Sequence, residues 1–115
     1  MSAAPLGPHS LQLDCAAELA RIGEWIPRVL TQKLRRRGLV VAISGGIDSS
    51  VCAALSVRAV GADKVFGLLL PERDSSGFSS ERGRLLAEHL GIRYQVHDIA
   101  PALEALGCYQ QRDEA

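Results

Sequence analysis

Apolar residues along this chain fall into two kinds of pattern, continuous runs and helically spaced positions. The continuous runs occupy residues 39–43 and 64–70, and residues 92–96 form a third segment with the composition of a strand. The first two have the composition of strands that are buried on both faces, as in a parallel sheet. We therefore predict three strands at these positions.

The segment before the first run has apolar residues at helical spacing from Leu11 to Leu34. This spacing predicts one helix, or two helices with a kink near Pro27, ended by Gly38. Cations in its last turn suit a helix carboxyl end that faces solvent. Contact with a phosphate or a tRNA is the alternative for these cations, which are Lys33, Arg35, Arg36 and Arg37.

Three further helices are predicted from the intervals between and after the strands. One covers residues 47–60; the next follows a polar loop, is capped by Ser79 or Ser80 and ends at Gly91. A short helix over residues 99–106 comes after the third strand. The helix over residues 47–60 is expected to turn four apolar residues inward, namely Val51, Ala54, Leu55 and Val57.

Alternation of strands and helices predicts βαβ units with right-handed crossovers. The expected fold is α/β, a Rossmann-like parallel sheet with helices on both faces, of which three strands make about half. Residues 1–10 contain two prolines and are interpreted as a flexible lead-in. Residues 11–115 are interpreted as the N-terminal part of one incomplete domain, because the last residues carry no stop signal.

Composition excludes several classes of protein. The 13 basic and 13 acidic residues give a formal net charge of zero, and 4% of residues are aromatic, so we expect no nucleic-acid partner. No apolar run approaches the roughly 20 residues that span a bilayer, so no membrane partner is expected either. The chain begins without a secretory signal, and its three dispersed cysteines indicate a cytoplasmic location rather than a disulfide scaffold.

The residues after the first run, Ser44-Gly45-Gly46-Ile47-Asp48-Ser49-Ser50, form the candidate chemical site. Three known kinds of turn fit poorly. A Walker A loop needs a lysine that is absent here, and a dinucleotide fingerprint needs G-x-G-x-x-G. The sequence around Ser44 differs by one residue from the G-x-S-x-G pattern of a nucleophile elbow. However, the only later histidines, His89 and His97, do not suggest a catalytic triad.

A strand, a glycine turn and a helix N-terminus together favour an anion site, because the turn exposes N–H groups. Gly45 and Gly46 let the backbone approach phosphate oxygens, and Ser44 and Ser49 offer hydroxyl groups. Asp48 would repel phosphate unless Mg²⁺ lay between them, and phosphate and carboxylate oxygens are usual ligands of that ion. The alternative is a capped helix without a ligand, with Ser44 or Asp48 as its N-cap.

The S-G-G-x-D-S pattern resembles the pyrophosphate-binding loop of the ATP pyrophosphatases, and residues 42–50 look like the loop of NAD synthetases. The same loop type occurs in GMP synthetases, asparagine synthetases and tRNA-thiolating enzymes. Three further segments favour NAD synthetases within this superfamily. They are Leu68-Leu69-Leu70-Pro71 with Arg73-Asp74-Ser75-Ser76, then Leu86-Ala87-Glu88-His89-Leu90-Gly91-Ile92, then Asp98-Ile99-Ala100-Pro101.

This resemblance implies an ATP-dependent, amide-forming ligase. ATP would adenylate the carboxylate of deamido-NAD with release of pyrophosphate, and ammonia would then attack to give NAD and AMP. No protein nucleophile is implied. Arg73 is a candidate for contact with nucleotide or substrate, and residues 72–80 for a loop that closes over the site. The implied nucleotide-binding residues are Ala42, Ile43, Ser44, Gly45, Gly46, Ile47, Asp48 and Ser49, with Asp48 also as ligand of Mg²⁺.

The resemblance also implies a homodimer for a full-length member, with ATP, deamido-NAD and ammonia as its small-molecule partners. Two alternatives remain open at this point. The chain could be a nucleotide-binding module without catalysis, or an ATP pyrophosphatase relative that amidates another carboxylate. A tRNA-thiolating activity is less favoured, since no cysteine pair or net basic charge supports it.

Overall fold

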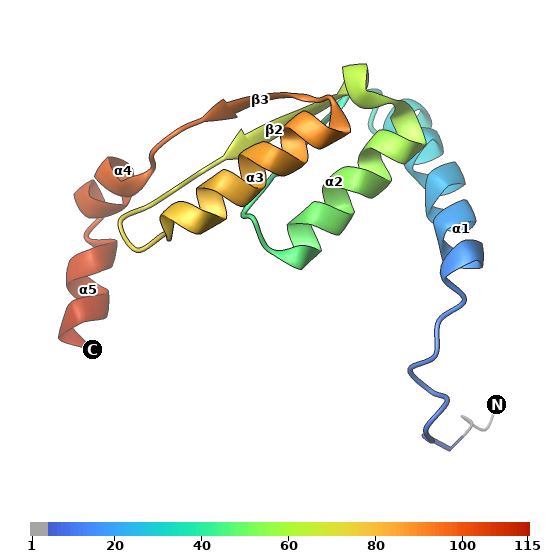
Figure 1. The fold of residues 1–115 in the computed structure, drawn as a ribbon, viewed down its shortest axis with the longest axis horizontal. Helices are drawn as coiled ribbons and strands as arrows, with labels where there is room; N and C mark the ends of the chain where they lie inside the picture. Colours follow the sequence, from blue (N-terminus) through green and yellow to red (C-terminus); the bar gives the residue numbers. More distant parts are fainter. Residues whose placement is uncertain (1–4) are drawn as a thin grey trace.

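The computed structural model describes residues 5–115, which form a small parallel sheet with helices packed against it (Figure 1). Residues 1–4 lie outside the described residues. The predicted lead-in over residues 1–10 and the chain start that was predicted to lack a secretory signal both fall partly on them. The elements in chain order are α1 (Cys15–Arg28), a π-helical turn η1 (Val29–Lys33), β1 (Leu39–Ala42), α2 (Ile47–Val60), a 3-10 turn η2 (Ala62–Lys64), β2 (Val65–Leu69), α3 (Gly77–Leu90), β3 (Arg93–Val96), α4 (Ala100–Ala105) and α5 (Cys108–Glu114).

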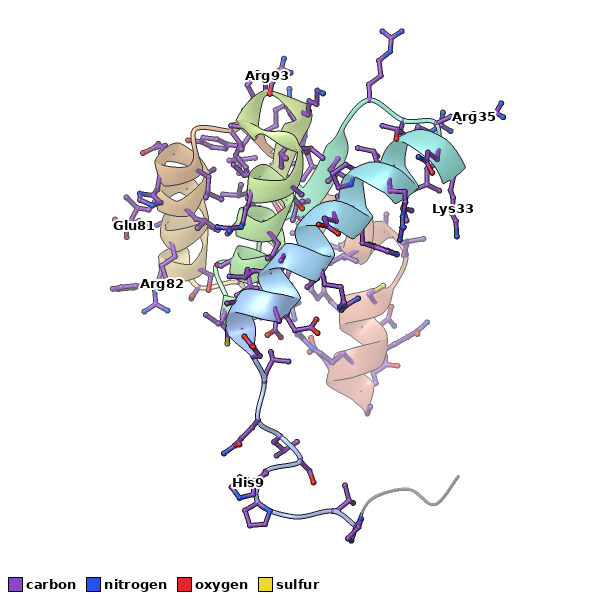
Figure 2. The ribbon with its side chains drawn as sticks, turned by 90° about the vertical axis from the view of Figure 1, so that its right-hand side faces the viewer. His9, Lys33, Arg35, Glu81, Arg82 and Arg93 are labelled. Atoms are coloured by element: carbon purple, nitrogen blue, oxygen red, sulfur yellow. The ribbon has the colours of Figure 1, made fainter. Side chains whose placement is uncertain are left out.

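The first helical segment starts later than predicted and does not break at its proline. Asp14 caps α1, because its carboxylate accepts the N–H of Ala17 at 3.1 Å. The helix continues through Pro27 and widens at once into η1, where the i to i+5 bond from Leu34 N–H to the Val29 carbonyl is 2.9 Å. The basic end of this segment faces solvent, and Lys33 extends away from the ribbon in Figure 2.

All strand pairs are parallel, and the strand order is β1-β2-β3. Alternate residues of each strand point to the same face of the sheet. One face therefore carries Val65, Gly67 and Leu69 of β2 together with the residues of β1 and β3 that pair with them. This face packs under α2 and α3. The fully packed core there consists of Ile43, Ala53, Val65, Leu69, Ala87 and Ile92.

The α/β class and the parallel Rossmann-like sheet are as predicted, but α2 and α3 lie on the same face of the sheet (Figure 1). The physical reason is the strand order. The chain moves in one direction from β1 to β2 to β3, so two right-handed crossovers place both helices on one side. Within residues 5–115 no crossover helix covers the other face, and Val40 is 66% exposed there, whereas its strand was predicted to be buried on both faces.

Local details of three helices also differ from the sequence prediction. Val51 and Ala54 point outward from α2, and the buried residues of that helix are Ala53 and Ser56. The cap of α3 is Ser76, three residues before the first predicted one. The sequence did not predict α5, although it is a full helix with a buried tyrosine. No helix within residues 5–115 has the length and apolar character that a bilayer crossing requires.

Candidate functional site

The turn between β1 and α2 is held by its own serine hydroxyl groups. The Oγ atoms of Ser44 and Ser49 lie 3.0 Å apart, and Ser49 Oγ also accepts the backbone N–H of Ser44 at 3.1 Å. Ser44 Oγ accepts the N–H of Gly46 at 3.2 Å, and Ser50 Oγ donates to the Gly46 carbonyl at 2.6 Å. These bonds fix the shape of the turn without involving any distant residue.

Gly45 is required at its position for two independent reasons. Its φ of +85° lies in a region that residues with a side chain rarely adopt. A Cβ atom here would also lie 2.9 Å from the carbonyl carbon of Ser79, and closer still to the carbonyl oxygen. The turn therefore packs backbone to backbone against the first turn of α3, which brings two segments far apart in sequence into contact.

The N-terminus of α2 begins directly after this turn. Gly46 is the N-cap, with extended φ and ψ, and no side chain among residues 5–115 caps the helix. The capped-helix alternative from the sequence, with Ser44 or Asp48 as N-cap, is therefore wrong. The first-turn N–H groups and the positive end of the helix dipole remain available to an anion.

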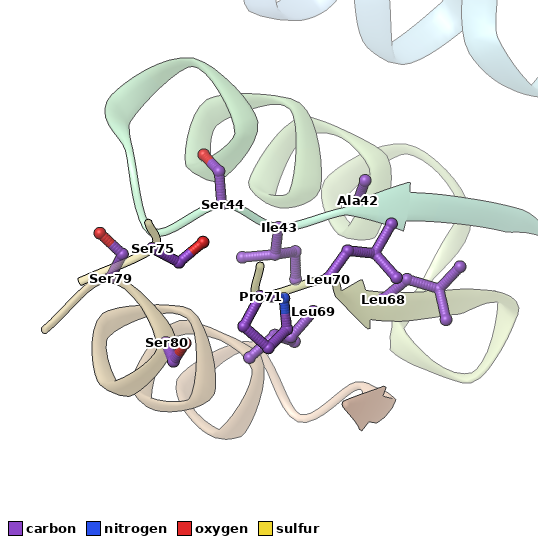
Figure 3. A pocket seen from close by; sticks show the side chains of 10 residues that line it. All are labelled: Ala42, Ile43, Ser44, Leu68, Leu69, Leu70, Pro71, Ser75, Ser79 and Ser80. Carbon is purple, nitrogen blue, oxygen red and sulfur yellow. The ribbon is translucent and has the colours of Figure 1, made fainter. Parts of the chain in front are cut away.

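A pocket of about 140 Å³ opens beside the turn, where the carboxyl ends of β1 and β2 meet. Figure 3 shows the hydroxyl groups of Ser44, Ser75 and Ser79 gathered on one side and apolar side chains on the other. Whole small-molecule sites usually occupy roughly 300–1,000 Å³, so this pocket has the size for part of a ligand. The lining residues are Ala42, Ile43, Ser44, Leu68, Leu69, Leu70, Pro71, Ser75, Ser79 and Ser80.

The structure brings some of the predicted residues into this pocket and leaves others beside it. Ala42, Ile43 and Ser44 line it, whereas residues 45–49 form the adjacent turn and the first turn of α2. Asp48 is exposed there, and Ile47 is 76% exposed. Arg73 is not a lining residue; its guanidinium lies against Tyr109 instead.

Three serines of the pocket were missed as site residues. All three lie in the loop over residues 72–80 that was expected to close over the site, but Ser75 was not named as a ligand contact, and Ser79 and Ser80 were expected to cap a helix. Parallel strands end at the same edge of a sheet, so hydroxyl groups after β2 must come close to those after β1. The serine-rich loop after the second apolar run was the signal that could have identified them.

No charged side chain within residues 5–115 lines the pocket. The negative charge of a bound phosphate would therefore be met by N–H groups, hydroxyl groups and the end of α2. Among these residues there is also no group of three or more His, Cys, Asp and Glu that could hold a metal ion. A cation beside Asp48 would have to take most of its ligands from phosphate oxygens and water, which is how Mg²⁺ is usually bound. The residues present fit that mode of binding.

Comparison with known proteins places the chain in a family. The family model described as NAD synthase matches residues 18–115. The chain belongs to the NAD synthase family. The resemblance of the S-G-G-x-D-S loop and its neighbouring segments to NAD synthetases is thereby confirmed.

Relatives within this family include NH(3)-dependent NAD(+) synthetases of two bacteria. The one from Mesorhizobium japonicum is 53% identical over 105 residues, which are 91% of this chain and 33% of the relative. The one from Rhizobium meliloti is 54% identical over 104 residues, 90% of this chain and 31% of the relative. The chain thus spans about a third of the length of these relatives.

Two solved structures that are similar to this one are both named synthetases. An NH3-dependent NAD synthetase from Campylobacter jejuni, in complex with the nitrate ion, has a TM-score of 0.74 and 29% sequence identity. The match covers 82% of this chain and 40% of the synthetase chain. An NMN synthetase from Francisella tularensis has a TM-score of 0.77 and 27% sequence identity, and the match covers 88% of this chain and 41% of that one. These similarities support the Rossmann-like α/β fold described above.

Proposed function

We propose that this chain is the ATP-binding part of an ATP-dependent, amide-forming ligase of NAD synthetase type. Residues 11–115 would then be the N-terminal part of its ATP-binding α/β domain. The observation that carries the proposal is the uncapped helix α2, which begins behind the Ser44–Gly46 turn and beside a hydroxyl-lined pocket. Membership of the NAD synthase family supports the choice of reaction.

In the proposed reaction, a carboxylate oxygen of deamido-NAD attacks the α-phosphorus of ATP, and pyrophosphate leaves. Ammonia then attacks the acyl carbon, and the amide and AMP are released. Residues 42–49 would hold the phosphates, with N–H groups of the turn and of α2 directed at the charge that builds on the leaving pyrophosphate. The chain supplies positioning and electrostatic stabilisation, and no side chain acts as a nucleophile.

We also propose Asp48 as a ligand of Mg²⁺. The exposed position of Asp48 on the first turn of α2, and the lack of a cationic side chain among the described pocket residues, support this role. When bound, the ion would neutralise phosphate charge and act as a Lewis acid toward phosphate oxygens. Asp48 would hold the ion through its carboxylate, and phosphate and water would supply the remaining ligands.

The location and assembly of the full-length protein remain part of this proposal. The three cysteines, Cys15, Cys52 and Cys108, are all free and exposed, which suits a reducing cytoplasm. A homodimer is proposed from the family resemblance, and sedimentation of the full-length protein would test it. The expected partners are the small molecules ATP, deamido-NAD and ammonia.

A pyrophosphate-release assay on the full-length protein tests the proposed reaction. With Mg-ATP and ammonia, release should require deamido-NAD and should match the NAD formed. Release with nicotinic acid mononucleotide alone would indicate another acid substrate, an outcome with a structural precedent since one similar structure is named an NMN synthetase. Binding of Mg-ATP without release under any acid would contradict the ligase and favour a nucleotide-binding module.

A further inference from the structure

Helix α5 is bonded to the loop that follows β2, although 36 to 40 residues of sequence separate the bonded groups. Three consecutive loop residues take part. Glu72 and Arg73 contact Tyr109, and Asp74 pairs with Arg112. The same loop forms one wall of the pocket through Pro71 and Ser75. None of the α5 residues lines the pocket itself.

Tyr109 is the centre of this contact. Its side chain is only 7% exposed, and its hydroxyl group donates to Glu72 Oε2 at 2.8 Å. The hydroxyl oxygen of Tyr109 also accepts the backbone N–H of Arg73 at 3.1 Å. Desolvation raises the pKa of this hydroxyl group above its usual value; the Arg73 N–H opposes this shift, and the Glu72 carboxylate adds to it.

The ring and the ion pairs around it hold the same loop. The Arg73 guanidinium lies 4.0 Å from the centre of the Tyr109 ring, a cation–π distance, and bonds Asp113 at 3.3 Å. Arg112 is bonded to Asp74 and Asp113, and lowers the pKa of both carboxyl groups below their usual range. Exposed ion pairs of this kind contribute little each, so the buried tyrosine is the main attachment.

A short chain of contacts leads from Tyr109 to the pocket. Glu72, which accepts the tyrosine hydroxyl, donates its backbone N–H to Ser75 Oγ at 2.9 Å, and Ser75 lines the pocket. The next residue, Ser76, caps α3 by accepting the N–H of Ser79 at 3.2 Å. Ser79 also lines the pocket, and its carbonyl packs against Gly45 of the turn.

We propose that Tyr109 is a positioning residue for the nucleotide pocket. Through Glu72 and Arg73 it holds residues 72–76 where Ser75 and Ser79 face the Ser44 turn. This role rests on the proposed function, because it assumes that the pocket receives part of ATP. Of the predicted loop over residues 72–80, residues 77–80 belong to α3 and residues 72–74 are bonded to α5. That this loop closes over the site stays a prediction.

The substitution Tyr109→Phe in the full-length protein tests the role, since it keeps the ring and removes the hydroxyl group. Hydrogen exchange of the Arg73 amide should become about tenfold faster, as expected when a hydrogen bond worth about 1.4 kcal/mol is lost. The matched control is Tyr94→Phe. It removes the other tyrosine hydroxyl, which donates to Glu88 at 3.2 Å, away from the pocket, and should leave Arg73 exchange unchanged.

Nucleotide binding provides the second measurement. The Kd for Mg-ATP, measured by calorimetry, should rise about tenfold in Tyr109→Phe and stay at the parent value in Tyr94→Phe. Pyrophosphate release should show a raised KM for ATP with a smaller change in kcat. Glu72→Gln keeps an acceptor for the tyrosine and should bind Mg-ATP nearly as the parent does.

The outcomes separate this role from the proposed reaction. Unchanged Arg73 exchange in Tyr109→Phe, or faster exchange with an unchanged Kd for Mg-ATP, would overturn the positioning role. A parent protein that binds Mg-ATP but releases no pyrophosphate with any acid would contradict the ligase reaction. In that case the comparison of Kd values would still decide whether Tyr109 positions the pocket.

Discussion

The substitution Gly45→Ala probes the contact on which the candidate site is built. Gly45 has a φ of +85°, and a Cβ atom there would lie 2.9 Å from the carbonyl carbon of Ser79. Alanine must therefore adopt a disfavoured backbone conformation or push α3 away from the turn. Either response moves Ser44 and Ser79 apart, and both of these residues line the pocket.

The expected cost follows from two separate effects. The left-handed conformation costs a residue with a side chain about 1–2 kcal/mol. Forcing an extra carbon into a packed contact typically adds about 1–3 kcal/mol, so the free energy of unfolding should fall by about 2–5 kcal/mol. With a urea m-value of about 1–3 kcal/mol/M, a loss near the middle of this range lowers the unfolding midpoint by roughly 1–3 M.

Urea unfolding of the parent protein and two glycine variants measures this cost. The matched control is Gly46→Ala, the neighbouring residue, whose φ is −87° and whose added Cβ would meet only Ser44 Oγ at 3.4 Å. That variant should change the free energy of unfolding by less than about 1 kcal/mol, since a poorer N-cap is offset by a less flexible unfolded chain. A Gly45 variant no less stable than the Gly46 variant would refute the reasoning.

Three further predictions concern the metal, the α5 contact and the core. Asp48→Asn should weaken Mg-ATP binding in calorimetry by at least about 10-fold with unchanged unfolding. The control Asp63→Asn changes an exposed acid in η2, beyond the far end of α2, and should bind as the parent does; equal affinities of the two variants would contradict the metal role. Arg112 lowers the pKa of Asp74 below 3.8, so the stability that Arg112 contributes should be present above that pH and disappear as pH falls through the lowered pKa. Urea unfolding of Arg112→Gln and parent over a falling pH series from pH 7 checks this, and a difference that stays constant as the pH falls would contradict it. Leu69→Ala should cost about 2–5 kcal/mol in urea unfolding because Leu69 is 2% exposed, and a loss under about 1 kcal/mol would contradict tight packing there.

Some elements were predictable from the sequence because local residues fix them. The bounds of α2, Ile47–Val60, came out as predicted, since a glycine turn precedes the helix and Gly61, with a φ of +91°, ends it. The start of α3 was missed because several serines can each cap a helix. Phe78, in the first turn of α3, is 70% exposed and so lies off the apolar face of the helix. The apolar pattern therefore did not show which of the serines is the cap.

Helix α5 shows a different limit of sequence reasoning. Its single buried residue is Tyr109, and the contacts that hold it come from Glu72 and Arg73, more than 30 residues earlier. One buried position gives no helical periodicity, so no pattern in residues 108–114 predicted the helix. The sequence also did not predict that Arg73 lies against this helix rather than in the pocket, because its contact with Tyr109 joins segments far apart in the chain.

The sequence by itself determined the chemistry at the end of β1. Ser44, Gly45 and Gly46 between an apolar strand and a helix fix a turn with free N–H groups through bonds that all lie within seven residues. Only the tertiary structure decided what surrounds that turn. Parallel pairing brings the serines after β2 to the same sheet edge, the direction of the strand order places both helices on one face, and α5 returns to hold the pocket wall. Such contacts depend on how distant segments pack. The serine-rich loop after β2 is a local signal for the first of them, but the residues of α5 carry no local pattern that reveals theirs.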